Sequence, residues 1–571
     1  MENKKNRNYN IFFNTHTVSG IVISLGLFVI FFCGAFALFM ENIDHWETNE
    51  KNGAVIEPID YQRVLDKVEE KGYDMHGRTF SISSHQDHIN VFSRPLSDSS
   101  LVKSALAILP DSVAQGNISL ELDIKTLEDY DESKEVKAHL GDFIYGLHYF
   151  RPIPVIGQYL SGLVALFFLF AIITGLIVHW EKIRSNFFTF RLKSSVKNLW
   201  TDAHTALGVI GLPFQLMYAV TGAIFGLTIL IFMPYAMVLF GGDQIAMFEK
   251  VYPDPALKQY EVKGYIEQSN GVNTFAERTL SSIPDENVEE VFVSVSNYQD
   301  QNAHFAITVR TNLKSGFFNH IQDVYHIQGG EVVHHKEASS APAYSVAVVE
   351  FIHRIHFADY GNYFVKLLYF LTALLTCFMI MSGVMIWLKA RDKIAYKHKK
   401  KFNQRVGQIY VGASMGLFPG IALLFLLIKI YPSGMENRFD QITWIFAAFW
   451  LAYTIYSLFA KNYTRITRHA LWLAGILGIA IPVANGITTG LWLWKSFGEG
   501  YIDTFFIDLS WLLIALISLT IVSRIKDKIS EQEIAIEGVQ IKEKKKGEAS
   551  MPKVQKQEPV LAIKTSDKYT S

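Results

Sequence analysis

Two pairs of histidines in this chain lie in matching sequence contexts, and imidazole is a common metal ligand. His16 and His204 each open a His-Thr-x-x-Gly segment at the start of an apolar stretch. In both segments a Gly-Ala pair begins 18 residues after the histidine, at Gly34 and Gly222. Matched spacing of this kind indicates that one part of the chain repeats another.

The second pair, His148 and His356, shows the same kind of correspondence. Each histidine lies five residues after the Phe of a Phe-Ile dipeptide. A glycine follows each of them by 27 residues, at Gly175 and Gly383. We therefore predict that the first two membrane helices, with the segment between them, are duplicated as the third and fourth.

Parallel repeats in a membrane are related by an axis along the membrane normal. Such an axis would bring His16 opposite His204 near one face (the first pair) and His148 opposite His356 near the other face (the second pair). Two facing imidazoles fill both axial positions of a haem iron, which favours electron transfer over oxygen chemistry. The sequence thus predicts two haem b groups, held by these four histidines, that form a path across the bilayer.

Other interpretations of these residues stay open. A histidine at a helix end can be an interfacial side chain or a cap, and a repeat can outlive the loss of its ligands. His179 is a reserve ligand for the first pair, and His353, one turn from His356, is a reserve for the second. Arg151 and Arg354 could bind haem propionates through charge-assisted hydrogen bonds, or could simply anchor helix ends at the interface.

The composition places these histidines in a membrane protein. Half of the 571 residues are hydrophobic and only 19% are charged, which is too apolar for an ordinary soluble protein. Apolar runs long enough to cross about 30 Å of hydrocarbon predict about eight helices. These lie near residues 18–40, 159–179, 206–233, 364–388, 409–431, 442–460, 470–493 and 505–522.

Lysines and arginines in the short loops predict the orientation, because such loops stay on the cytoplasmic side. The connection after the fourth helix carries eight basic residues between Lys389 and Arg405, and the N-terminus and the C-terminal tail are also basic. Both termini are therefore predicted to be cytoplasmic. The net charge is only −1, and the basic residues are spread over these loops, so the charge does not indicate nucleic-acid binding.

Two long segments are predicted outside, each as a small α+β module. The first combines a helix with three strands, and the second ends in a hairpin with Gly-Gly at its turn. The predicted elements are a helix at 61–72 with strands at 80–83, 89–93 and 118–124, then a helix at 262–269 with strands at 291–295 and 304–310 and a hairpin at 324–333. The resulting division is 1–40 first helix, 41–142 first external domain, 143–240 second and third helices, 241–350 second external domain, 351–390 fourth helix, 391–408 basic loop, 409–523 four further helices and 524–571 charged tail.

Several chemistries are excluded or disfavoured. Cys33 and Cys377 are the only cysteines, so covalent haem attachment and iron–sulfur clusters lack their ligands. No flavin or nicotinamide fingerprint is present, which leaves the electron donor to a separate molecule. The His85/His88 and His334/His335 pairs lack a third ligand at fixed spacing, and we interpret them as exposed polar residues.

These features resemble the PepSY-associated transmembrane proteins, a family that includes iron-regulated membrane proteins and ferric-siderophore reductases. The resemblance covers about the first 390 residues, and Ala358 stands where the family often has glycine. Its carriers are the His-Thr-x-x-Gly openings at His16 and His204, the Leu-His148 and Ile-His356 dipeptides followed by Gly157 and Gly361, the helix end from Ser382-Gly383 to Trp387, and the hairpin from Val324 to Val333.

The resemblance implies a bacterial inner-membrane protein with periplasmic PepSY domains and b-type haems. We therefore expect an all-α polytopic bundle with two small α+β PepSY-like extracytoplasmic domains, acting as a reductase of ferric siderophores or other ferric chelates. Quinol or a separate cytoplasmic reductase would supply the electrons. The alternatives are an iron-chelate permease without redox chemistry and a membrane-tethered interaction protein. The four helices after Arg405 lie outside the resemblance and have no predicted role.

Overall fold

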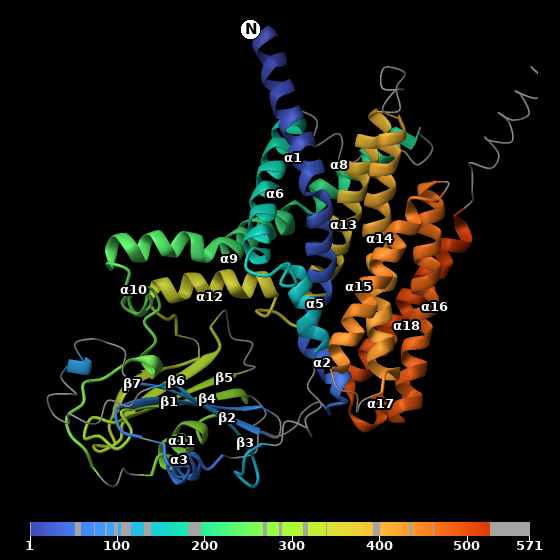
Figure 1. Ribbon diagram of the computed structural model, residues 1–571. Helices are drawn as coiled ribbons and strands as arrows, with labels where there is room; N and C mark the ends of the chain where they lie inside the picture. Colours follow the sequence, from blue (N-terminus) through green and yellow to red (C-terminus); the bar gives the residue numbers. More distant parts are fainter. Residues whose placement is uncertain are drawn as a thin grey trace, which may run out of the picture.

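The protein combines a bundle of long helices with a β-sheet that lies at one end of it (Figure 1). The computed structural model describes residues 2–51, 59–73, 75–85, 88–95, 101–103, 116–130, 139–180, 196–266, 271–284, 288–311, 318–338, 340–391, 400–432, 435, 437–460 and 462–525. The charged tail beyond Ile525 and most of the basic loop at 391–408 lie outside these ranges.

Seven helices within these ranges are long and apolar enough to cross a membrane. They are α1 (Glu2–Ala37), α6 (Gly157–His179), α9 (Leu212–Leu239), α13 (Tyr363–Ala390), α14 (Lys400–Ile430), α16 (Tyr463–Thr489) and α18 (Ile502–Arg524). The span predicted at 442–460 corresponds to α15 (Arg438–Ser457), which packs beside α14 but is not among the seven. The structure therefore supports a polytopic membrane protein. In Figure 1, α1 begins and α18 ends on the side of the bundle away from the sheet.

The third predicted span is not one straight helix. It is broken at Gly211 into α8 (Val196–Ile210), which carries His204, and α9. Pro213 lies in the first turn of α9, where its missing N–H costs no helical hydrogen bond. After the break α9 runs across the bundle rather than along it (Figure 1). It crosses α6 where a Cβ built on Gly226 would lie 2.4 Å from the Cα of Gly162, so the two backbones touch there.

The two external segments do not form two separate modules, as was predicted, because their strands join in one sheet. The sheet has seven strands in the order β3-β2-β1-β4-β5-β6-β7, and all neighbours are antiparallel. The first segment gives β1 (Arg78–His85), β2 (His88–Pro95) and β3 (Ile118–Asp123); the second gives β4 (Val288–Ser296), β5 (His304–Thr311), β6 (His320–His326) and β7 (Val332–Lys336). Separate sheets would each leave an edge strand with unpaired backbone N–H and C=O groups. Pairing β1 with β4 satisfies both edges, which is why the two segments join in one sheet.

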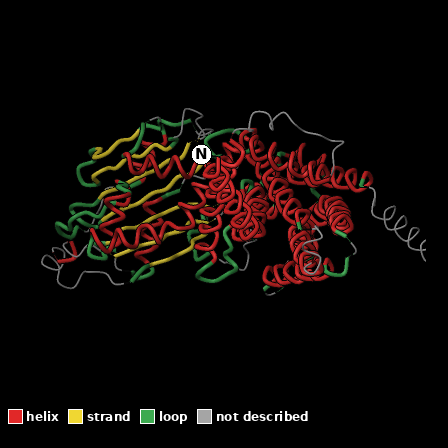
Figure 2. Tube along the Cα trace, turned by 90° about the horizontal axis from the view of Figure 1, so that it is seen from above, coloured by secondary structure: helices red, strands yellow, loops and turns green. Residues whose placement is uncertain are grey.

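Seen from above in Figure 2, the strands lie side by side next to the helix bundle. Two helices cover one face of this sheet and complete its core (Figure 1). They are α3 (Tyr61–Glu70), which was predicted, and α11 (Asn273–Leu280). The helix predicted at 262–269 was wrong for residues 262–266, which are not helical, while residues 267–269 lie outside the described ranges; α11 begins at Asn273. Val64 and Leu65 of α3 and Phe275 of α11 pack in a single cluster with Ile82 and Val293 from the two joined strands.

Four shorter helices connect the sheet to the bundle: α2 (Met40–Thr48), α5 (Leu140–His148), α10 (Gln244–Val251) and α12 (Tyr344–Phe357). Two of them, α5 and α12, carry the second histidine pair. A single turn, η2 (Pro255–Leu257), packs on the sheet, and α17 (Leu493–Glu499) precedes α18. Because α5 and α12 end at or one residue beyond a paired histidine, the chain turns sharply right after each ligand candidate.

The union of the two segments makes a testable prediction about register. Ser81 on β1 lies opposite Ser294 on β4, and directly opposite residues in antiparallel strands have Cα atoms about 4.5–5.5 Å apart. Replacing both serines by cysteine should therefore give a disulfide under mild oxidation, measured by mass spectrometry of the digested protein. Ser83→Cys with Ser294→Cys is the matched control, displaced by two residues. A crosslink in the control pair alone would contradict the shared sheet.

Candidate functional site: two facing histidine pairs

The structure brings together the two histidine pairs that the sequence predicts. The ring centres of His16 and His204 are 6.2 Å apart, with an angle of 68° between the ring planes. Those of His148 and His356 are 6.0 Å apart, with an angle of 57°. Both members of the first pair lie within helices, α1 and α8, and both members of the second lie at the C-terminal ends of helices, α5 and α12.

The spacing within each pair is compatible with two imidazoles that share one metal ion. A metal–imidazole bond is about 2.0 Å long, so ring centres on opposite sides of one metal lie about 6 Å apart. Both observed values agree with this distance. Ordinary ring contacts in this protein reach the same spacing, as between Tyr145 and His148 at 6.3 Å, so the argument for a shared metal also needs the orientation of the rings. The donor set, two neutral imidazoles, is one that haem iron accepts. In this respect the residues fit a haem.

Hydrogen bonds fix which nitrogen of each ring is free. The Nδ1 atoms of His16, His204 and His148 lie 2.8, 2.9 and 2.8 Å from the backbone oxygens of Ala171, Met379 and Ile30. A carbonyl oxygen only accepts, so Nδ1 carries the hydrogen in all three, and Nε2 keeps its lone pair. Metal-bound histidines are commonly oriented in this way.

His356 also carries its hydrogen on Nδ1, but the acceptor is a hydroxyl group. Its Nδ1 lies 2.7 Å from Oγ1 of Thr221, and that hydroxyl donates its own hydrogen to the backbone oxygen of Met217 at 2.8 Å. Because the hydroxyl hydrogen is used, Thr221 accepts from Nδ1–H of His356. All four Nε2 atoms are therefore available as ligands.

Glycines make room for three of the four rings. A Cβ built on Gly34 would lie 2.6 Å from Nδ1 of His148. One on Gly175 would lie 3.1 Å from Cε1 of His16, and one on Gly383 would lie 3.0 Å from Cε1 of His204. These are the glycines that the sequence spacing singled out, and their role is close packing of an imidazole on the facing helix. Gly222 is the exception, since its nearest neighbour is Ala165.

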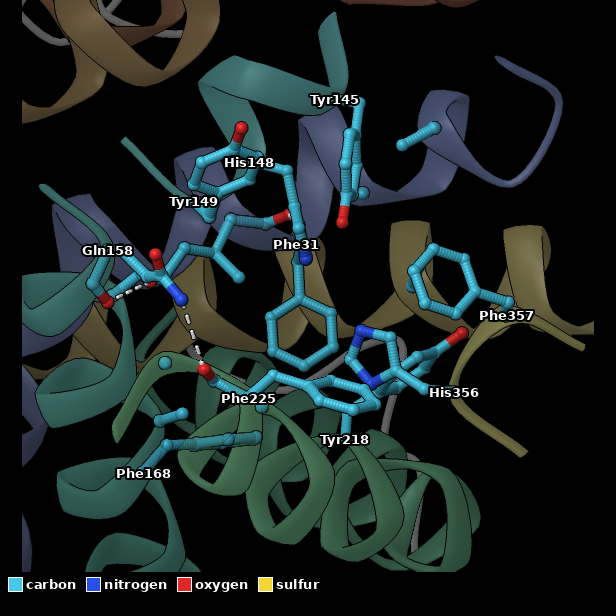
Figure 3. A pocket seen from close by; sticks show the side chains of 18 of the residues that line it. Phe31, Tyr145, His148, Tyr149, Gln158, Phe168, Tyr218, Phe225, His356 and Phe357 are labelled. Carbon is cyan, nitrogen blue, oxygen red and sulfur yellow. Dashed lines mark hydrogen bonds between the residues drawn. The ribbon is translucent and has the colours of Figure 1, made fainter. Parts of the chain in front are cut away.

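A cavity of about 490 Å³ adjoins the second pair (Figure 3). His148 and His356 point into it from opposite sides, and aromatic rings form much of its wall, among them Phe31, Tyr218 and Phe225. The ring centre of His356 lies 5.4 Å from that of Tyr218 and 5.1 Å from that of Phe225, with both rings nearly perpendicular to it. An apolar, aromatic cavity with two convergent imidazoles suits a flat hydrophobic cofactor.

The aromatic wall and Thr221 were not predicted from the sequence. Phe31 lies three residues before Gly34 on α1, so helical spacing could have placed it beside that glycine. Tyr218 and Phe225 come from α9, whose direction the sequence does not reveal. Thr221 immediately precedes Gly222, and its role depends on that same helix.

The two reserve histidines lie near the pairs they were assigned to. His179 ends α6 and is close enough to His204 to interact electrostatically with it. His353 lines the cavity, and its ring stacks on Phe357 with 4.4 Å between ring centres. Its Nδ1 also lies 3.8 Å from Asp359. Both remain second choices, because the matched sequence spacing selects His16, His204, His148 and His356.

Arg151 and Arg354 have carboxylate partners from the protein itself. Arg151 donates two hydrogen bonds to the carboxylate of Asp142, at 2.8 and 2.6 Å. Arg354 donates to the carboxylate of Asp359 at 3.2 Å. Neither arginine is among the residues that line the cavity. The structure thus favours the anchoring interpretation over propionate binding for both.

The external histidines were predicted to be exposed, and the structure agrees for one of them and disagrees for another. His335 is exposed and bonded to Asp323 at 2.6 Å, as expected for a surface polar residue. His88 is buried against the ring of Tyr130, which corrects the prediction that it is exposed. Within the described ranges no group of three or more His, Cys, Asp and Glu side chains could hold a metal ion.

The position two residues after each second-pair histidine adopts a left-handed conformation, at φ 62° for Phe150 and φ 56° for Ala358. Glycine adopts this conformation most easily, which accounts for the family preference at Ala358. The chain accepts the strain in order to turn into α6 and α13 directly after the histidine.

Comparison with known proteins agrees with the resemblance inferred from the motifs. The model of the family described as the PepSY-associated TM region matches residues 13–390. A protein of Pseudomonas aeruginosa strain PAO1, named Uncharacterized protein PA4219, is 23% identical over 359 residues, which cover 60% of this chain and 86% of that protein. The family match spans both histidine pairs and most of the chain. The chain therefore belongs to the PepSY-associated transmembrane family.

Proposed function

We propose that this protein is a haem b electron-transfer protein of the bacterial inner membrane that reduces ferric siderophores or other ferric chelates in the periplasm. The observation that carries the proposal is the pairing of His16 with His204 and of His148 with His356, at ring distances of 6.2 and 6.0 Å. A bis-histidine haem transfers single electrons and has no open position for oxygen. Ferric chelates release iron more readily after reduction, which gives such a protein a function in iron uptake.

The residues of this chain would hold and orient the two groups. Each Nδ1–H bond to a neighbouring helix keeps an Nε2 lone pair directed away from that helix. Along α1, the 18 residues from His16 to Gly34 span about 27 Å, so the two pairs lie near opposite faces of a bilayer. Two sites at this separation would give an electron a route across the hydrocarbon.

The arrangement of the chain is compatible with the proposed orientation. The end of the bundle that carries the N-terminus lies away from the sheet (Figure 1). If the basic loops are cytoplasmic, as their lysines and arginines predict, the sheet and the second pair face the periplasm. Quinol or a cytoplasmic reductase would then donate electrons at the first pair, and the ferric chelate would accept them at the second. The permease and interaction-protein alternatives require no haem at all.

The proposal predicts the cofactor content of the purified protein. Protein made with adequate haem supply should show the reduced-minus-oxidised spectrum of six-coordinate b-type haem, at about two haems per chain. Acid extraction should remove all of the haem, because the sequence has no C-x-x-C-H motif for covalent attachment. Colourless protein would exclude the proposal and leave the permease or interaction alternatives.

Single histidine substitutions should affect the two sites separately. His356→Ala removes one ligand without adding bulk, so haem content should fall to about one per chain, or the second site should become five-coordinate. Ferric chelate reduction should be lost while the haem of the first site is still reduced from the cytoplasmic side. His204→Ala should have the complementary effect.

The matched control is His334→Ala, because this histidine lies on β7, outside the bundle. Haem stoichiometry, donor-driven haem reduction and ferrous iron release would be measured on all three variants in membranes. If either ligand variant keeps two six-coordinate haems and normal iron release, the paired assignment is wrong, and His353 or His179 becomes the next ligand to test.

A further inference from the structure

The five helices that the structure describes after the family match, α14 to α18, are called the C-terminal unit. This unit holds α2 through buried polar contacts. Trp46 of α2 donates its indole N–H to Asp508 of α18 at 2.9 Å. Asn485 of α16 donates to the other oxygen of the same carboxylate at 2.8 Å. Asp508, Asn485 and Trp46 are fully buried, so these bonds are shielded from water.

A buried lysine ties α2 to α14 in the same region. Nζ of Lys429 donates to the backbone oxygen of Trp46 at 2.6 Å and to Oδ1 of Asn49 at 3.0 Å. The same ammonium group lies 4.2 Å from the centre of the Trp46 ring. Both bonds go to groups at the C-terminal end of α2, where a cation is electrostatically favourable. A second carboxylate of α18, that of Asp503, bonds Asn42 and His45 at 2.7 and 2.6 Å.

The opposite side of α2 holds the start of α5. The carboxylate of Glu47 accepts hydrogen bonds from the backbone N–H groups of His139 and Leu140, at 3.0 and 2.8 Å. Asp44 accepts one from Gly141 at 3.0 Å. These N–H groups belong to the first turn of α5 and have no partner within the helix. Acidic groups from α2 thus cap a nine-residue helix whose last residue is His148.

The helix of the other second-pair histidine is built differently. α12 begins after Ala343, whose side chain has no polar atom, and it is longer, at 14 residues. His356 is instead oriented by Thr221 of α9. The link from the C-terminal unit through α2 therefore reaches one member of the second pair, His148.

An ion path is the other role that buried charges in a membrane suggest. The sequence of the C-terminal unit argues against it. α14 has no ionisable Asp, Glu, His, Lys or Arg between Arg405 and Lys429, and α16 has none between His469 and its end. α18 has none between Asp508 and Arg524. The charged groups gather at helix ends, as expected for a contact surface and not for a path across the bilayer.

We infer that the C-terminal unit acts as a clamp that positions His148, with α2 as the connecting element and Glu47 as the positioning residue. The clamp fixes the N-terminus of α5, and through this short helix it sets where the His148 ring lies relative to His356. The functional part of the inference rests on the proposed haem site, while the mechanical link from Lys429 to α5 stands on the contacts alone.

Two variants test this inference on the full-length protein. Glu47→Met removes the carboxylate, one oxygen of which accepts both backbone N–H groups of the α5 cap, and Lys429→Met breaks the contact with α14 without touching α5. Hydrogen exchange of the α5 amides should become roughly tenfold faster in Glu47→Met, the size expected for loss of a helix cap. It should change in the same direction in Lys429→Met. In both, the spectrum and midpoint potential of the second-site haem should shift, while those of the first-site haem stay as in the unaltered protein.

The matched controls are Glu499→Met and Lys495→Met, which alter a half-exposed ion pair on α17 of the same unit. They should change neither α5 exchange nor either haem. Unchanged α5 exchange in both test variants would overturn the clamp, and so would equal acceleration in α1 and α13, because that indicates general destabilisation. Absence of haem from the unaltered protein would defeat the proposed function instead, and the exchange data would still decide the mechanical link.

Discussion

The hydrogen bond from each imidazole Nδ1–H to a neighbouring helix is the constraint on which the site depends. An N–H group without an acceptor in hydrocarbon costs several kcal/mol. A helical carbonyl keeps a second lone pair after its own helical bond, so it can accept from a side chain. The imidazole must then lie directly on the facing helix, and Gly175 and Gly383 allow this for His16 and His204. The same requirement keeps α1 against α6, and α8 against α13.

The second pair satisfies this constraint by a different construction. His148 and His356 lie at or near the ends of short helices and not within long ones, so their positions depend on what fixes α5 and α12. Ile30 of α1 accepts from His148, and Thr221 of α9 accepts from His356. The break at Gly211 directs α9 across the bundle, which brings Tyr218, Thr221 and Phe225 to the cavity. The cavity at this pair thus follows from a helix that does not run straight through the bundle.

Sequence spacing was sufficient to predict which histidines would face each other. Three of the four glycines at the matched distances pack against one of these imidazoles. It also predicted α3 and the β6–β7 hairpin, whose periodicity and Gly-Gly turn are local signals. It did not predict the union of β1 with β4, since edge pairing between distant segments has no local signature. The direction of α9 and the buried position of His88 were missed for the same reason: tertiary contacts decide them.

The buried contacts of α2 illustrate a further limit. Asp508 and Lys429 are single charged residues in long apolar runs, and the sequence gives no indication that both contact Trp46. Their partners lie more than 380 residues earlier in the chain. Such long-range polar contacts become visible only once the helices are placed. They give the C-terminal unit, which lies outside the family match, a structural connection to the site.

The central claim is that each facing histidine pair shares one flat metal-containing group. The most direct test is an experimental density map of the protein, purified with haem supplied during expression, at a resolution that shows side chains. The account predicts planar density between His16 and His204 and again between His148 and His356, with Nε2 of each ring directed at its centre. A map with the pairs in place and nothing between them, or with haem on His179 or His353 instead, would contradict it.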